Sequence, residues 1–255
     1  MELPRFRGHL IPFEGRVNPF YPLDPNKPGD VRGAESLSYI VNLIVNNALV
    51  YGDIDITLDG KLDDQTTVPP EGNYPELAGT QDYLGINYYG PVRVSEFVPP
   101  IDGFPHLNVS EYDPLLPHNG LGREINAADF RATLDLYARY ILAFLITENG
   151  TETREFEQRG QDTMEHVYVL GQALKDGLTV LGYLHWSLTD NFEWTEGYAP
   201  RFGLYHVDYT SPDLTRSRTD GTDALRDIIR AGRIDHGLYD QYAGSCYPSD
   251  GRCSP

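Results

Sequence analysis

Residues 182–209 read GYLHWSLTDNFEWTEGYAPRFGLYHVDY, and this stretch decides how the rest of the chain is interpreted. It begins like a buried strand and continues through two tryptophans, six other aromatic residues and several acids, with no hydrophobic period of a helix or a strand. Such a segment predicts an irregular loop that lines a pocket. Flat aromatic faces contact the C–H faces of sugar rings, whereas carboxylates and indole N–H groups bind hydroxyls.

A plainer interpretation is that these aromatic residues are core residues, as an isolated tryptophan usually is. That interpretation has to account for Glu193, which lies between Phe192 and Trp194. A carboxylate in this setting must be solvated, paired or bound to a ligand. The pattern therefore favours a binding site.

The stretch resembles the C-terminal signature of glycoside hydrolase family 1, the retaining β-glucosidases and β-galactosidases, which reads much like GYxxWSLxDNFEWxxGYxxRFGLxxVDY. Two other segments carry the resemblance: residues 83–89, YLGINYY, and residues 146–150, ITENG, which is similar to the nucleophile motif of the family. The resemblance runs from about residue 17 to residue 231 and corresponds to the C-terminal half of a typical member. It implies hydrolysis of terminal β-D-glycosidic bonds with retention, as part of carbohydrate metabolism.

Strand-like and helical segments alternate about four times along the chain, which predicts parallel strands joined by right-handed crossovers. Helical spacing predicts helices that begin at a cap formed by Asp30, at a cap formed by Asn126, at Asp162 or Thr163, and around Leu225. Strands are predicted around residues 9–13, 83–89, 142–146 and 180–186, and an elaborated loop over 52–80. The expected fold is an α/β half-barrel, the last four βα units of a (β/α)8 TIM barrel, over residues 1–240, followed by a tail over 241–255.

The resemblance also implies the residues of the site. Glu148 would be the nucleophile, and Tyr89 would donate its hydroxyl to Glu148 and hold it in position. The residues implied to bind the sugar are Asn87, Trp186, Glu193, Trp194 and Phe202. Without the resemblance, Glu148 would be interpreted as a solvated loop acid and residues 87–89 as a strand end with structural tyrosines.

Three of these roles are more specific. Trp186 would stack on the sugar, Glu193 would bind its 4- and 6-hydroxyls, and Trp194 would bind its 3-hydroxyl. An acid at the position of Glu193 argues for an unphosphorylated β-glycoside, because it would repel a phosphate. The family further implies a cis peptide bond between Trp186 and Ser187.

Retaining hydrolysis needs two carboxyl groups roughly 5 Å apart, and the sequence supplies one of them. The Asn-Glu-Pro motif that carries the acid/base in the family does not occur in the sequence. The N-terminal Gln, His and Trp that bind sugar in the family are absent as well. Glu14 is the nearest upstream glutamate, but its neighbours do not resemble the motif. We therefore expect this chain to hold the nucleophile half of a site.

Composition excludes several other classes. The chain has 255 residues, a net charge of −18 and an isoelectric point near 4.6, which disfavours a nucleic-acid partner. It has no run of about eighteen apolar residues, so no membrane partner is expected. His185 and His206 have no ligand-type neighbours at metal-binding spacing, and we expect no metal and no cofactor.

Two features of the sequence bear on the cellular compartment of the protein. The first residues, MELPRFRGHLIPF, lack the pattern of a signal peptide, which favours a soluble protein of the cytoplasm. Cys246 and Cys253 lie close together near the C-terminus, and a disulfide between them would indicate secretion. The alternative, to which we give equal weight, is that both cysteines are free thiols.

Three functional hypotheses remain open from the sequence. In the first, the chain is a β-glycosidase whose N-terminal half is missing or comes from a second polypeptide. In the second, it is a non-catalytic half-barrel that binds carbohydrate or serves a structural role, with a second copy covering its strand edges. In the third, it is a decaying fragment without function. The expected small-molecule partner in the first hypothesis is a β-glycoside or oligosaccharide.

Overall fold

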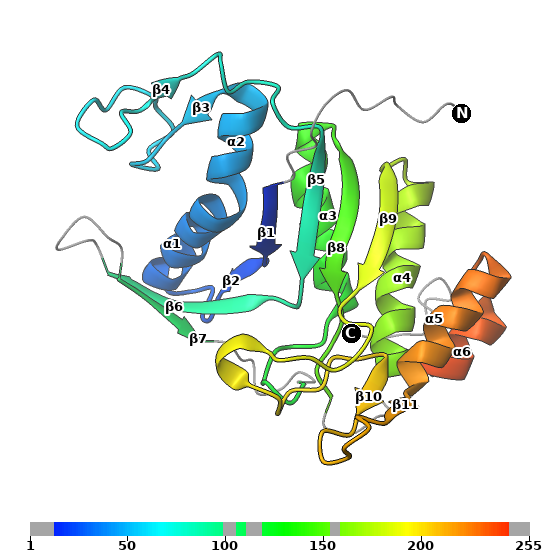
Figure 1. Ribbon diagram of the computed structural model, residues 1–255. Coiled ribbons are helices and arrows are strands. Elements are labelled where there is room, and N and C mark those ends of the chain that lie inside the picture. Colours follow the sequence, from blue (N-terminus) through cyan, green and yellow to red (C-terminus); the bar gives the residue numbers. More distant parts are fainter. Residues whose placement is uncertain (1–12, 99–105, 111–118, 154–158, 245–255) are drawn as a thin grey trace.

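The computed structural model describes residues 13–98, 106–110, 119–153 and 159–244. Its centre is a sheet of four strands in the order β1 (Phe13–Val17), β5 (Tyr83–Tyr88), β8 (Ala143–Asn149) and β9 (Val180–His185), and every neighbouring pair is parallel. Figure 1 shows these strands side by side, with all arrowheads at one edge. The pairing register sets Asn87 opposite Glu148 and Asn149 opposite His185. The carboxyl ends of the strands therefore lie together, where parallel α/β folds place their sites.

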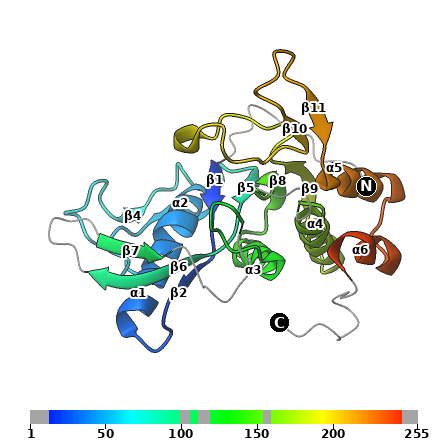
Figure 2. The same ribbon diagram turned by 90° about the horizontal axis from the view of Figure 1, so that it is seen from below.

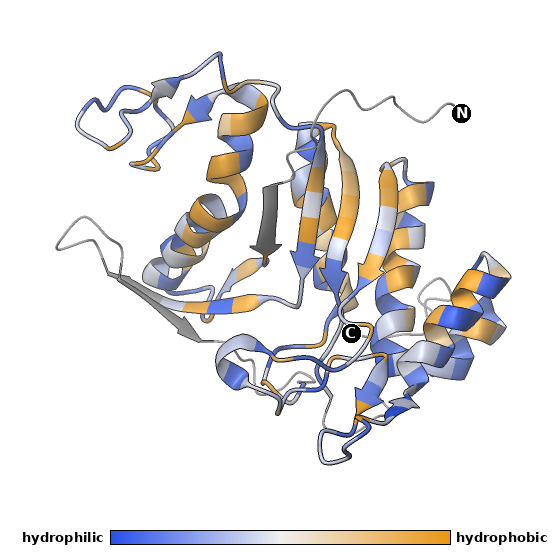
Figure 3. Cartoon of the chain, viewed as in Figure 1, coloured by the Kyte–Doolittle hydropathy of each residue, from blue (hydrophilic) through white to orange (hydrophobic). Residues whose placement is uncertain are grey.

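Helices α3 (Ala127–Tyr137) and α4 (Arg159–Lys175) cover one face of this sheet. Figure 2 shows both helices on the same side of the strands, and apolar side chains of both belong to the buried core. Colouring by hydropathy shows apolar residues along β5 and β8 and polar residues at their arrowheads (Figure 3). The buried core consists of Val17, Leu84, Ile86, Tyr88, Phe130, Leu134, Tyr137, Tyr140, Phe144, Ile146, Leu170 and Ala173.

The predicted cap of α3 is confirmed. The side chain of Asn126 accepts hydrogen bonds from the backbone N–H groups of Ala128 and Asp129, at 3.0 and 3.4 Å. Asp129 lies in the first turn, where a carboxylate complements the partial positive charge of the helix start. A 3-10 turn, η2 (Ala138–Tyr140), then leads into β8.

The first helical segment differs from the prediction at its start. Helix α1 (Pro28–Leu37) begins at a proline, and Lys27 occupies the N-cap without a side-chain cap bond. Asp30 is therefore not the cap. It lies buried in the first turn and accepts a hydrogen bond from the backbone N–H of Asp24 at 3.0 Å. The chain continues through a π-helical turn, η1 (Ser38–Leu43), into α2 (Ile44–Tyr51).

Other element boundaries also differ. Helix α4 begins at Arg159, a few residues before the predicted Asp162 or Thr163. Strand β8 extends to Asn149, so Glu148 lies inside the end of the strand and not in the loop after it. The strand predicted over residues 9–13 falls mostly outside the described residues, and β1 begins at Phe13. The side chain of Glu14 and both cysteines also lie outside what the structure describes.

The described residues also form three small sheets, two of which precede β8 in the chain. Strand β2 (Phe20–Pro22) runs parallel to β6 (Val92–Val98), which pairs antiparallel with β7 (His106–Ser110). The loop predicted over 52–80 contains the two-residue strands β3 (Asp53–Ile54) and β4 (Gly72–Asn73).

The C-terminal part follows β9 through an irregular segment, as the aromatic stretch predicts. That segment contains one 3-10 turn, η4 (Trp194–Glu196), and leads to β10 (Tyr205–Val207) and β11 (Arg216–Arg218). Helices α5 (Asp220–Ala231) and α6 (His236–Ala243) then pack beside α4. Within the described residues, no helix is long and apolar enough to cross a membrane.

The central sheet is open and forms no closed barrel. Among the described strands, β1 pairs with β5 alone and β9 pairs with β8 alone. Leucines near the free edge at β9 reach solvent: Leu181 is 37% exposed and Leu184 is 55% exposed. Unpaired edge strands with exposed apolar side chains tend to associate with other chains.

Candidate active site

A cavity of about 290 Å³ lies at the carboxyl edge of the sheet, and all seven residues expected at the site line it. They come from the ends of β5, β8 and β9 and from the aromatic segment after β9. The full lining is Asn87, Tyr89, Leu121, Arg123, Glu148, Trp186, Glu193, Trp194, Thr195, Glu196 and Phe202. Segments that are about a hundred residues apart in the chain therefore share one cavity, as the alignment of the strand ends requires.

Glu148 and Tyr89 are joined directly. The Tyr89 hydroxyl donates a hydrogen bond of 2.6 Å to Oε2 of Glu148. Burial of the ring raises the pKa of Tyr89 well above its ordinary value, and the hydrogen bond to Glu148 raises it further. The hydroxyl therefore keeps its proton at any ordinary pH and remains a donor to the carboxylate.

Asn87 lies one strand away from Glu148 and is held by a neighbour. The hydroxyl of Thr147 donates a hydrogen bond of 2.6 Å to Oδ1 of Asn87. Thr147 precedes Glu148 in β8, so this bond links the ends of β5 and β8 at the cavity. The two strand ends therefore hold Asn87 and Glu148 at fixed relative positions.

A second pair lies on the side of β9. The indole N–H of Trp186 donates a hydrogen bond of 2.9 Å to Oε1 of Glu193, which fixes both side chains. The peptide bond between Trp186 and Ser187 is cis, as the family resemblance implies. Trp194 is 81% exposed at the mouth of the cavity, and the buried Phe202 ring packs edge-on against Tyr89 at 5.9 Å between centroids.

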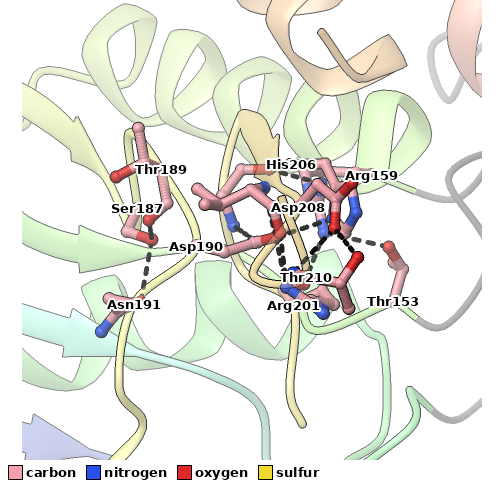
Figure 4. A network of polar contacts seen from close by, with 12 residues as sticks. Thr153, Arg159, Ser187, Thr189, Asp190, Asn191, Arg201, His206, Asp208 and Thr210 are labelled. Atoms are coloured by element: carbon pink, nitrogen blue, oxygen red, sulfur yellow. Dashed lines mark hydrogen bonds and ion pairs between the residues drawn. The ribbon is translucent and has the colours of Figure 1, made fainter. Parts of the chain in front are cut away.

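The segment after β9 is held by the buried carboxylate of Asp190, drawn in Figure 4. Its Oδ1 accepts from the backbone N–H of Gly203 at 2.9 Å. Its Oδ2 accepts from Val207 N at 3.0 Å, from Arg201 Nη1 at 3.2 Å and lies 2.8 Å from His206 Nδ1. One carboxylate therefore ties together the two ends of the loop that carries Glu193.

Arg159, at the start of α4, supports the same segment. Its guanidinium is buried and donates hydrogen bonds to the backbone carbonyls of Gly203 and Arg201. It also donates to Thr153 Oγ1 at 3.0 Å, so α4 is linked to the chain that follows β8 (Figure 4). Buried hydrogen bonds from one side chain to two separate segments favour a single loop conformation.

His185, one residue before Trp186, provides a pH test of this packing. Burial, with the positive charges of Arg159 and His166 nearby, lowers the pKa of His185 to about 3. The unfolded chain binds a proton at this residue from about pH 6.5 downward, whereas the folded chain does not until about pH 3. Stability should therefore decrease as pH falls through this window.

We expect the His185→Gln variant to lose less stability on acidification than the wild type. Between pH 7 and pH 5 the difference in the free energy of unfolding should be about 2 kcal/mol, the contribution of one proton. Urea unfolding at both pH values measures it. Equal pH dependence of the two proteins would contradict the low pKa of His185.

Four residues that line the cavity were not predicted from the sequence: Leu121, Arg123, Thr195 and Glu196. Thr195 and Glu196 lie inside the aromatic segment and could have been inferred from it. Leu121 and Arg123 lie in a turn before α3 that matches no motif. Arg123 places its guanidinium carbon 5.5 Å from the centroid of the Tyr89 ring.

One group of acids outside the cavity has ligand atoms close enough for a metal. The carboxylates of Asp55, Asp59 and Glu71 lie within 4.8 Å of one another in the loop around β3 and β4. Backbone N–H groups already donate to both oxygens of Asp55 and of Glu71. We assign these carboxylates to folding of the loop.

The chain belongs to glycosyl hydrolase family 1, whose family model matches residues 11–233. It is 30% identical over 224 residues to a β-galactosidase of Pyrococcus woesei, a match that covers 82% of this chain and 42% of that protein. It is 31% identical over 194 residues to a β-glucosidase of an Agrobacterium species, covering 71% and 41%.

A solved structure supports the same assignment. A β-glycosidase from Pyrococcus horikoshii superposes with a TM-score of 0.75 at 27% identity, covering 89% of this chain and 50% of that one. The chain therefore spans about half the length of its solved relative and less than half of the curated relatives.

Proposed function

We propose that this chain supplies the nucleophile half of a retaining β-glycosidase site that hydrolyses terminal β-D-glycosidic bonds. The observation that carries the proposal is the hydrogen bond of 2.6 Å from Tyr89 to Glu148, in a cavity that Trp186, Glu193 and Trp194 also line. A carboxylate with a fixed donor, facing aromatic and polar side chains, suits attack on a sugar.

In the proposed reaction, Glu148 attacks the anomeric carbon of the bound sugar. The bond from that carbon to the departing oxygen breaks, and a glycosyl ester forms on Glu148. Water then attacks the same carbon, which releases the sugar with its original configuration and frees the carboxylate. The departing oxygen needs a proton when it is a poor leaving group, and we propose that a carboxyl group outside this chain provides it.

The free strand edges indicate where the carboxyl group that donates the proton would come from. We propose that β1, β5, β8 and β9 are the last four strands of an eight-stranded barrel. The other half of the barrel, on a further segment of the same protein or on a second polypeptide, or else a second copy of this chain, would pair with the edges of β1 and β9 and cover the exposed leucines. Size measurement with and without candidate partners tests this association.

Binding of sugar without hydrolysis is the alternative function. It is favoured by the absence of an Asn-Glu-Pro motif from the sequence. The two functions separate on an aryl glucoside whose nitrophenolate leaves without a proton, because a binding module would take up this compound and leave it intact. For either function, Glu193 favours an unphosphorylated sugar.

Replacing Tyr89 by phenylalanine should lower kcat/KM on 4-nitrophenyl β-D-glucoside by about 10- to 100-fold. The variant loses one hydrogen bond to a charged group, a contribution of about 1.5–3 kcal/mol. Its fold should be unchanged, because the ring still packs on Phe202. Steady-state release of nitrophenol measures the effect. Unchanged turnover would show that Tyr89 does not hold the reacting carboxylate.

A further inference from the structure

One cation lies among the acids of the candidate cavity. Of the described residues that line it, Arg123 alone carries a positive charge, whereas Glu148, Glu193 and Glu196 are acidic. The chain as a whole carries a net charge of −18, so an anionic ligand has little general attraction to it. An arginine in this position either balances the acids or binds an anion that the ligand brings.

The contacts of Arg123 favour the second role. Its guanidinium lies over the Tyr89 ring, 5.5 Å from the centroid. Within the described part of the chain, no ion pair joins it to Glu148, Glu193 or Glu196. A guanidinium that stacks on a ring keeps its N–H groups at its edge, where they can bind a carboxylate with two parallel hydrogen bonds.

The strand order places Arg123 relative to the sugar. Tyr89 follows β5, Glu148 ends β8 and Trp186 follows β9, and β8 lies between the other two strands. Arg123 lies over Tyr89, which follows the strand on one side of β8, and Glu193 is bonded to Trp186, which follows the strand on the other side. If Glu193 binds the 4- and 6-hydroxyls of the sugar, Arg123 lies nearer the anomeric carbon, from which the leaving group departs.

We propose that Arg123 is a specificity-determining residue that binds a carboxylate on the leaving group. This inference rests on the function proposed above and adds a substrate class to it: β-glycosides of aromatic acids. The exposed indole of Trp194 and the side chain of Leu121 line the same cavity and offer apolar surface to an aromatic ring.

A matched pair of substrates tests the proposal: 4-nitrophenyl β-D-glucoside and its 2-carboxy derivative, which differ by one carboxylate. The quantity of interest is the ratio of their kcat/KM values, anionic over neutral. In Arg123→Gln this ratio should fall about tenfold relative to the wild type, the effect of one charge-assisted contact near the surface. In the wild type the ratio should also fall as salt is raised from about 0.05 to 0.5 M.

Two further variants make the result specific. Arg123→Lys keeps the charge and should retain part of the preference, because lysine cannot form the bidentate contact. Arg230→Gln, on the exposed C-terminal turn of α5, changes the net charge by the same amount far from the cavity lining and should leave the ratio unchanged.

Other outcomes overturn the proposal in distinguishable ways. If Arg123→Gln loses the same factor on both substrates, Arg123 positions Tyr89 and does not select the leaving group. If the wild type cleaves both substrates and the ratio does not respond to substitution or salt, this inference fails and the proposed function stands. If the wild type neither cleaves nor binds either glucoside, the proposed function fails, and the substrate preference with it.

Discussion

Replacement of Glu148 by alanine is expected to lower kcat/KM on 4-nitrophenyl β-D-glucoside at least about a thousandfold. The substitution removes the carboxylate that would form the glycosyl ester and that accepts the hydrogen bond from Tyr89. A nitrophenyl leaving group departs without protonation, so the measurement reports on the nucleophile even when the acid/base is absent.

Glu196→Ala is the matched control for this substitution. Glu196 lines the same cavity and carries the same charge, but it is exposed in η4 and has no assigned part in the reaction. We expect its turnover to remain within a few-fold of the wild type. If Glu148→Ala retained full turnover, or if both variants lost the same factor, Glu148 would not be the nucleophile.

Replacement of Asp190 by alanine should lower the free energy of unfolding by about 3–5 kcal/mol. The carboxylate is 5% exposed and accepts hydrogen bonds from two backbone N–H groups and from Arg201. Removing it leaves those donors and the Arg201 charge without their partner. The loop that carries Glu193 would then lose these side-chain contacts between its ends and keep the backbone hydrogen bonds between residues 187–190 and 202–205.

Urea unfolding at neutral pH measures this effect. Asp213→Ala, in the exposed turn between β10 and β11, removes an acid from the same region and should change the stability by less than about 0.5 kcal/mol. A loss of under about 1 kcal/mol in Asp190→Ala would show that the network of Figure 4 does not hold the loop.

The sequence predicts the order of strands and helices well, because their signals are local. The cap at Asn126 is a property of a few neighbouring residues, and the structure confirms it. The start of α4 and the cap assigned to Asp30 are wrong, because tertiary packing determines them. The carboxylate of Asp30 accepts a hydrogen bond from the backbone of Asp24. The guanidinium of Arg159 donates hydrogen bonds to carbonyls some forty residues away.

The same distinction between local signals and tertiary packing applies to the candidate site. Glu148, Tyr89, Trp186 and Glu193 lie in recognisable segments, and the structure brings them to one cavity. Arg123 and the bonds of Asp190 depend on how distant segments meet, for which the sequence carries no local pattern. The openness of the sheet is likewise a property of pairing, seen at β1 and β9 and not in any motif.

Identifying the atom that bonds to the sugar is the most direct test of Glu148 as the nucleophile. The folded chain is incubated with 2-deoxy-2-fluoro-β-D-glucosyl fluoride, whose anomeric fluoride leaves without protonation and whose glucosyl group forms a slowly hydrolysed ester. The masses of the peptides of the treated chain are then measured. We expect one added sugar, on the peptide that contains Glu148. An adduct on another carboxylate, or no adduct in a chain shown to bind the compound, would contradict it.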